Sequence, residues 1–105
     1  MSLRRSAELP TVSPKELMIL ELLVNEGRMY GLELVAASRG HLKRGTVYVT
    51  LGRMEEKGYV RSRQEDAPAA AGGLPRRVYE PTALGRRVCD AWGLVRQQLA
   101  PGLAR

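Results

Sequence analysis

The sequence has no phenylalanine, and only one cysteine, one histidine and one tryptophan. Cys89 alone cannot form an internal disulfide, which favours a reducing environment. His41 alone cannot form a zinc site, because zinc needs three or four ligands, so we expect no metal and no cofactor. No apolar run approaches the roughly 18 residues that span a bilayer, and the N-terminus lacks the apolar core of a signal peptide. These absences favour a cytoplasmic protein that is not held in a membrane.

Signs of catalysis are also missing. The sequence has no serine–histidine–carboxylate order, no glycine-rich phosphate loop and no paired carboxylates in an evident cleft. We therefore do not expect an enzyme. A lone helical cysteine could act as a redox sensor, but without a resolving partner an inert cysteine is favoured.

Positive charge is the most informative feature of the composition. The 105 residues, 44% hydrophobic and 27% charged, suit one small globular domain. The net charge of +6 favours an acidic partner, nucleic acid first and an anionic membrane surface second. Much of this charge lies in residues 39–63, where seven basic side chains accompany only Glu55 and Glu56. The seven are Arg39, Lys43, Arg44, Arg53, Lys57, Arg61 and Arg63.

Residues 1–12 have no periodicity and are expected to form a flexible arm. Ser13 and Glu16 then form the pattern of a capping box around Pro14, which predicts a helix that ends at Gly27. Apolar residues cover more than half of this helix. A helix of this kind is buried on more than one side, so we expect one side to face a second subunit.

Two further helices are predicted to form a helix-turn-helix. The first covers about residues 30–38, with Leu32, Val35 and Ala36 facing inward, and Gly31 at its start suits a close approach between helices. The second covers about residues 43–57 and ends at Gly58.

Two strands, residues 59–64 and 76–82, are predicted to form a wing around a loop at residues 65–75. Thr82 is suited to cap a last helix, which Pro101 and Gly102 are expected to stop. The predicted fold is mainly α with a small β-wing: an arm (1–12), a winged helix-turn-helix domain (13–81) and a dimerisation helix (82–105). The predicted dimer contacts, most of them a coiled-coil-like seam of the last helix, are Leu84, Val88, Ala91, Trp92, Val95 and Leu99, with Ile19 and Leu23 of the first helix.

The third predicted helix carries a glycine, Gly52, that costs roughly 1 kcal/mol relative to alanine. A helical wheel places Val47, Leu51 and Met54 toward the core, and Gly52 on the opposite face. A face thinned by glycine lets the helix approach a large partner such as the DNA major groove. The alternative is that Gly52 packs against a neighbouring element and the arginines are solvated. The predicted DNA contacts are Lys43, Arg44, Thr46, Tyr48 and Arg53 of this helix, and Arg61, Arg63, Arg76 and Arg77 of the wing.

Three motifs resemble the PadR-type transcriptional regulators. They are "LLVNEGRMYGLELV", "RGTVYVTLGRMEEKGYVRS" and "RRVYEPTALGRRV", and the similarity covers residues 17–88. The resemblance implies a winged helix-turn-helix homodimer on palindromic operators, usually a repressor, that dimerises through its C-terminal helix packed on the partner's first helix. It places Thr46 and Tyr48 near the DNA. The chain departs from the family at Val49, where many relatives carry proline, and at Gly52.

Two alternatives remain open. The chain could be a winged-helix module that binds another protein rather than DNA, with Glu55 and Glu56 in the contact. Some members of the family that the chain resembles hold flat, apolar ligands between subunits on aromatic side chains. Trp92 is the candidate residue for such a small hydrophobic effector, although packing in the dimer interface is favoured for a buried tryptophan.

Overall fold

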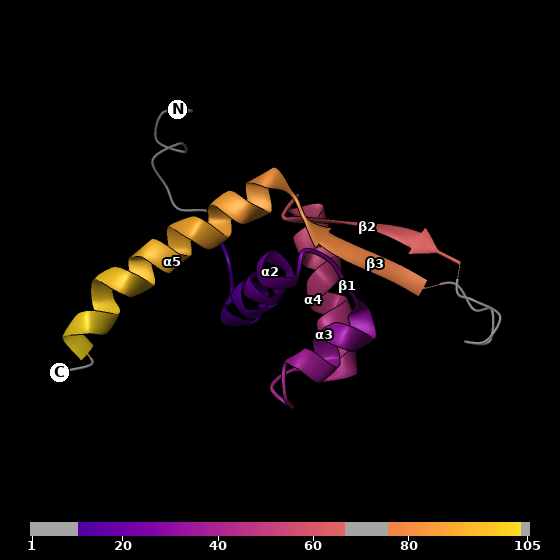
Figure 1. Ribbon diagram of the computed structural model, residues 1–105, viewed down its shortest axis with the longest axis horizontal. Coiled ribbons are helices and arrows are strands. Elements are labelled where there is room, and N and C mark those ends of the chain that lie inside the picture. The colour runs from indigo at the N-terminus through magenta and orange to yellow at the C-terminus, as the bar shows by residue number, and fades with distance from the viewer. Residues whose placement is uncertain (1–10, 67–75, 104–105) are drawn as a thin grey trace.

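The computed structural model describes residues 11–66 and 76–103, with side chains up to Leu94 in the last helix. These described residues form four helices and a three-stranded antiparallel sheet of order β1-β3-β2 (Figure 1). The predicted arm and loop fall almost entirely outside the described residues. The elements are α2 (Pro14–Glu26), β1 (Met29–Tyr30), α3 (Gly31–Ala37), α4 (Arg44–Glu56), β2 (Val60–Glu65), β3 (Arg76–Pro81) and α5 (Ala83–Leu103).

Helix α2 begins with the predicted capping box. The Ser13 hydroxyl accepts the Glu16 N–H at 3.1 Å, and the Glu16 carboxylate accepts the Ser13 N–H at 2.9 Å. The same carboxylate, on a residue only 3% exposed, receives the ammonium of Lys57 at 2.9 Å and 3.0 Å. Lys57 is the C-cap of α4. One buried acid thus caps α2 and fixes the end of α4 beside it.

The wing is a sheet of three strands rather than two. The short strand β1 pairs with β3 through Met29 and Tyr79, and β2 pairs with β3 through Ser62 and Tyr79. Because Met29 and Tyr79 are buried, this sheet closes one side of the core.

The inward face predicted for α3 is wrong at two positions. Leu32 is 54% exposed and Ala36 is exposed, whereas Leu34 is fully buried. The seven-residue helix begins at Gly31, so the buried side follows Gly31, Leu34 and Ser38 at three- and four-residue spacing. A one-position error rotates the predicted stripe by about 100°.

Helix α5 starts against the core and then extends away from it beside α2 (Figure 1). Thr82 caps it as predicted, because its hydroxyl accepts the Gly85 N–H at 3.0 Å and donates to the Gly58 carbonyl at 2.6 Å. The expectation that Pro101 and Gly102 stop the helix is wrong, since α5 continues to Leu103. A proline near a helix end removes only one backbone donor and keeps a helical φ angle.

Candidate nucleic-acid interface

Helix α4 turns one face to the core and the other to solvent. Val47, Leu51 and Met54 are fully buried, as predicted. A Cβ atom added at Gly45 or Gly52 would meet nothing within 4 Å. Gly52 therefore packs against no described element, which removes the alternative reading of this glycine. The outer face of α4 is open and has little side-chain bulk.

Tyr48 lies at the edge of this face, against α3. A Cβ atom on Gly31 would come within 2.5 Å of the Tyr48 ring and hydroxyl. The close approach predicted for Gly31 is thus a contact with an aromatic side chain of α4. Tyr48 itself remains 39% exposed, so part of this residue is accessible beside the outer face of α4.

The start of α4 is basic. Lys43 is the N-cap residue, Arg44 is the first helical residue, and both side chains are exposed. The first turn contains no acid. Backbone N–H groups and the helix dipole attract anions at such an end, and the two cations add to this attraction. Thr46 is half-buried and Arg53 is exposed on the same helix.

A cleft of about 450 Å³ lies between α4 and the start of α2. Two of its lining side chains are cations, Lys15 and Arg53, and none is acidic. Sequence reasoning missed Lys15, because only the packing of α2 on α4 brings it beside the outer face of α4. The other lining residues are Gly45, Thr46, Val49 and Thr50.

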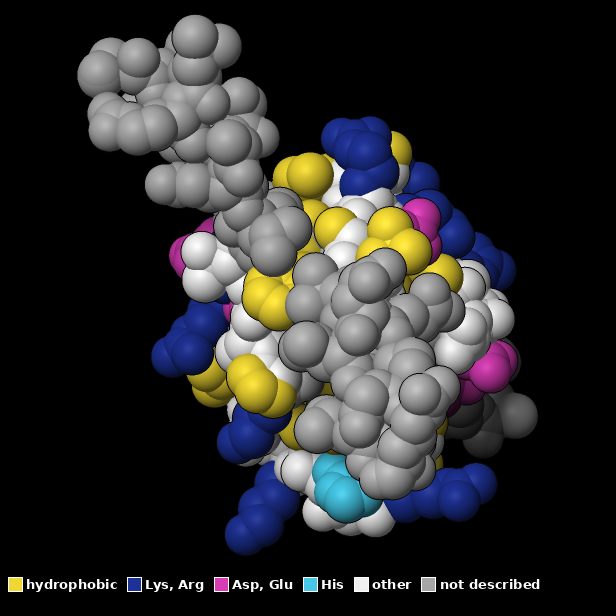
Figure 2. Space-filling view, turned by 90° about the vertical axis from the view of Figure 1, so that its left-hand side faces the viewer, with side chains coloured by type: hydrophobic (Ala, Val, Ile, Leu, Met, Phe, Trp, Pro, Cys, Tyr) yellow, Lys and Arg dark blue, Asp and Glu magenta, His cyan; other side chains and the backbone are white. Residues whose placement is uncertain are grey.

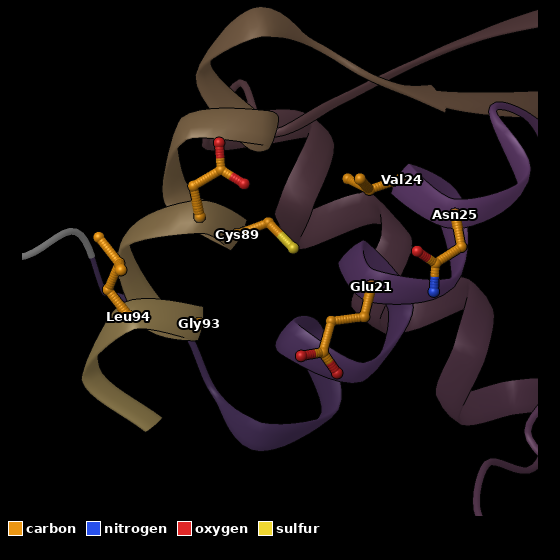
Figure 3. A pocket seen from close by; sticks show the side chains of 7 residues that line it. Glu21, Val24, Asn25, Cys89, Gly93 and Leu94 are labelled. Atoms are coloured by element: carbon orange, nitrogen blue, oxygen red, sulfur yellow. The ribbon is translucent and has the colours of Figure 1, made fainter. Parts of the chain in front are cut away.

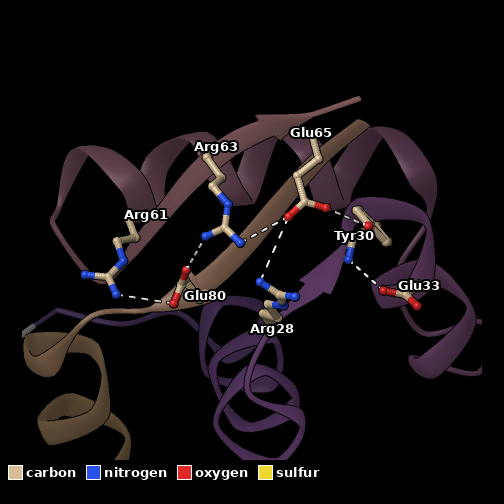
Figure 4. Close-up of polar contacts among 7 residues, drawn as sticks. All are labelled: Arg28, Tyr30, Glu33, Arg61, Arg63, Glu65 and Glu80. Atoms are coloured by element: carbon tan, nitrogen blue, oxygen red, sulfur yellow. Dashed lines mark hydrogen bonds and ion pairs between the residues drawn. The ribbon is translucent and has the colours of Figure 1, made fainter. Parts of the chain in front are cut away.

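One face of the wing carries a row of alternating charges that ends at a tyrosine hydroxyl (Figure 4). We call this row the wing ladder; it consists of Arg61, Glu80, Arg63, Glu65 and Tyr30. Arg61 donates to Glu80 at 3.2 Å, and Arg63 donates to Glu80 at 3.0 Å and to Glu65 at 3.1 Å. Tyr30 donates its hydroxyl to Glu65 at 2.8 Å. Because two carboxylates face Arg61 and Arg63, these arginines carry less free positive charge than the sequence indicates.

The two carboxylates are held in their charged forms. The hydrogen bond from Tyr30, followed by those from Arg63, lowers the pKa of Glu65 below its ordinary 4.5. The hydrogen bond from Arg61 and the charges of both arginines lower the pKa of Glu80 in the same direction. The Tyr30 hydroxyl, which donates to Glu65, has its pKa raised above 10.0. Both carboxylates of the wing ladder are therefore ionised at neutral pH, and the Tyr30 hydroxyl keeps its proton.

The four predicted wing arginines do not form one patch. Arg61 and Arg63 lie in the wing ladder, and Arg76 stacks over the Tyr30 ring at 4.3 Å on the same side of the sheet. Arg77 lies on the other side, where it donates to the Ser62 hydroxyl at 3.0 Å. That hydroxyl in turn donates to Glu55 of α4 at 2.8 Å. Arg77 is thus the wing arginine that is linked to α4.

Of the residues predicted for a dimer interface, some are buried inside the single chain and others are exposed on α5. Ile19, Leu23 and Val88 are 0%, 0% and 1% exposed within the single chain, so its own core already encloses them. Leu84 on α5 is 37% exposed, and Ala91 and Trp92 are half-buried. The side chains of Val95 and Leu99 lie outside the described part. Leu94, which was not predicted, is 60% exposed. Figure 2 shows the side of the molecule toward which α5 extends. On that side, hydrophobic side chains are exposed in several places among basic ones.

A second cleft, of about 590 Å³, separates α2 from α5 (Figure 3). Its lining includes Cys89, two acids and the exposed Leu94. Trp92 is not part of this lining but packs against the core. The cleft is therefore not an aromatic site for a flat ligand. The lining residues are Glu21, Val24, Asn25, Cys89, Asp90, Gly93 and Leu94.

The described residues contain no group of three or more metal-binding side chains. No helix among them combines the length and the apolar character that crossing a bilayer requires.

Comparison with known proteins agrees with this geometry. The sequence model of the "Transcriptional regulator PadR-like family" matches residues 19–91. A transcriptional regulator from Thermoplasma acidophilum is 30% identical, with a TM-score of 0.62 over 85% of this chain and 89% of that one. A PadR family transcription regulator from Clostridium difficile is 24% identical, with a TM-score of 0.68 over 84% of this chain and 94% of that one.

Bacillus subtilis PadR, solved in complex with operator DNA, is 20% identical with a TM-score of 0.65, over 72% of this chain and 44% of that one. At this identity the likeness shows a shared fold, the winged helix-turn-helix. The search among curated proteins found no match.

Proposed function

Because this chain belongs to the PadR-like family of transcriptional regulators, and not to a family of enzymes, we propose that it binds double-stranded DNA with α4 in the major groove. The observation that carries this proposal is the open outer face of α4, where Gly45 and Gly52 leave free space. Major-groove entry needs a helix with such an accessible face. Lys43 and Arg44 at its start and Arg53 near its end supply the cations that phosphates require.

The wing is proposed to contact the DNA backbone mainly through Arg76 and Arg77. Both are exposed and neither forms an ion pair with an acid among the described residues. Arg61 and Arg63 contribute less, because Glu80 and Glu65 share their charge. Bacillus subtilis PadR has been solved with operator DNA, which supports the same kind of partner for this chain.

We further propose a cytoplasmic homodimer that represses transcription by covering a palindromic operator. The exposed Leu84 and Leu94, with the half-buried Ala91 and Trp92, would form the partner-facing surface of α5. A two-fold dimer places its two α4 helices on half-sites about one helical turn, or a multiple, apart. A bound dimer on a promoter excludes the polymerase from it.

Light scattering of the purified chain tests the dimer. Leu94→Glu is expected to give a monomer, because a charge would be buried in the interface. Leu32→Glu is the matched control, since Leu32 is 54% exposed on α3, and it should leave the mass unchanged. A wild-type monomer would contradict the dimer.

Footprinting on the DNA upstream of the chain's own gene, at two salt concentrations, tests the DNA-binding proposal. Protection of a symmetric site that weakens with salt is expected. If no DNA is protected while α4 captures a protein partner, the chain is a protein-interaction module instead. Glu55 is bound to Ser62, so only Glu56 of the two acids is left for such a partner.

A further inference from the structure

Val49 is exposed where the fold gives it no role. Its side chain is 59% exposed, the highest value among the large hydrophobic residues of α4. Valine is also a poorer helix former than alanine. Gly45, four residues before it, and Gly52, three residues after it, leave open space on both sides. The isopropyl group therefore projects between two positions that carry no side chain, with the exposed Arg53 one turn after it.

The isopropyl group is also held in place. Valine in a helix keeps one χ1 rotamer in about 90% of cases, because both branches clash with the preceding turn in the other rotamers. A fixed apolar group loses little conformational entropy when a partner covers it. Val49 is thus preorganised for contact with an apolar group of matching size.

The surroundings of Val49 indicate what that partner is. Val49 lines the cleft that also holds the cations Lys15 and Arg53 and contains no acid. Phosphates therefore suit the rim of this cleft, and an apolar group suits its wall. On the base edges of the major groove, the C5-methyl of thymine is the one apolar group.

We propose that Val49 packs against the C5-methyl group of a thymine in each operator half-site, while Lys15 and Arg53 hold phosphates beside it. This inference rests on the proposed DNA-binding function and adds the base that α4 distinguishes. It assigns sequence discrimination to an apolar contact rather than to a hydrogen bond. Cytosine at the same position lacks the methyl and presents a polar amino group to the valine.

The probe is a duplex enriched by the wild-type protein from a random-sequence library. Each thymine in one half-site is replaced in turn by deoxyuridine, which removes only the methyl group. We expect one replacement to weaken wild-type binding by about three- to fivefold, the loss expected for one buried methyl group. If cytosine at that position is replaced by 5-methylcytosine, the affinity of the wild-type protein should rise by a similar factor.

Val49→Ala identifies the residue responsible. The substitution removes an exposed side chain and favours the helix, so the variant should fold. We expect this variant to bind the thymine and deoxyuridine duplexes equally. The coupling energy between Val49 and the methyl group, obtained from the double-mutant cycle, should then equal the full loss that the wild-type protein shows on methyl removal. Leu32→Ala, an exposed apolar residue on α3, is the control and should show the wild-type pattern of sensitivity.

These experiments distinguish an error in the proposed DNA-binding function from an error in the proposed role of Val49. If the wild-type protein enriches no sequence, the DNA-binding function itself is wrong. If it binds the selected duplex but no thymine is sensitive to methyl removal, only the role of Val49 is wrong. The same holds if Val49→Ala keeps the full sensitivity.

Discussion

The ring of Tyr48 occupies the space that a side chain on Gly31 would need, with its nearest atoms 2.5 Å from the position of a Cβ. Glycine at the first position of α3 therefore sets the orientation of a tyrosine on α4. Because Tyr48 borders the face proposed to enter DNA, a residue of α3 affects the interface without touching it.

Gly31→Ala is expected to rotate Tyr48 and to weaken operator binding by about 2- to 10-fold, the size of one lost polar contact. Stability should change little, because the displaced group is the far end of a partly exposed side chain. Gel shifts and thermal unfolding measure the two effects. In a Tyr48→Ala background the Gly31 substitution should have no effect on affinity; an additive effect would contradict the mechanism.

Gly52→Ala is expected to separate stability from function. It should stabilise the fold by about 1 kcal/mol, because alanine is the better helix former and the space around Gly52 is open. It should also weaken DNA binding, because a methyl group then stands between the helix backbone and the groove. Denaturant unfolding and titration of a DNA duplex give both values. A more stable variant with unchanged affinity would show that Gly52 does not face DNA.

Arg44→Ala and Lys15→Ala should each weaken binding to all DNA sequences. If each side chain neutralises one phosphate, the slope of log K against log salt should become shallower by about 0.9 per contact. Affinities measured over a series of salt concentrations give that slope. An unchanged slope for Lys15→Ala would mean that the cleft between α2 and α4 holds no phosphate.

Glu80→Gln should increase non-specific DNA binding. Glu80 accepts from both Arg61 and Arg63, so its loss frees positive charge on the wing. We expect a tighter complex with random-sequence DNA and a salt slope steeper by about one contact. Equal slopes for wild type and variant would show that this face of the wing lies away from the duplex.

The wing ladder should also weaken in acid. The pKa values of Glu65 and Glu80 are lowered below 4.5 in the folded state. A lowered folded-state pKa adds stability at neutral pH, and this is lost as the pH falls below 4.5 through that lower value. Carbon NMR titration of the two carboxyl groups should give midpoints below 4.5. The Glu80→Gln variant assigns the signals, and an ordinary midpoint for Glu80 would contradict its ion pairs.

Local features of the chain were readable from the sequence. The capping box of Ser13 and Glu16, the Thr82 cap and the bounds of α4 follow from side-chain chemistry within a few residues. The open face around Gly52 followed from helical periodicity. The inward face of α3 did not, because a seven-residue helix has too few turns to fix its rotation.

The sequence by itself determined which segments form helices and strands, since capping and periodicity act between near neighbours in the chain. Tertiary structure alone decided that Glu16 binds Lys57, that Lys15 joins Arg53 at one cleft, and that Glu80 pairs with Arg61 and Arg63. Net charge adds up along a sequence, whereas the field at a surface depends on which opposite charges the fold places within a few ångströms of each other.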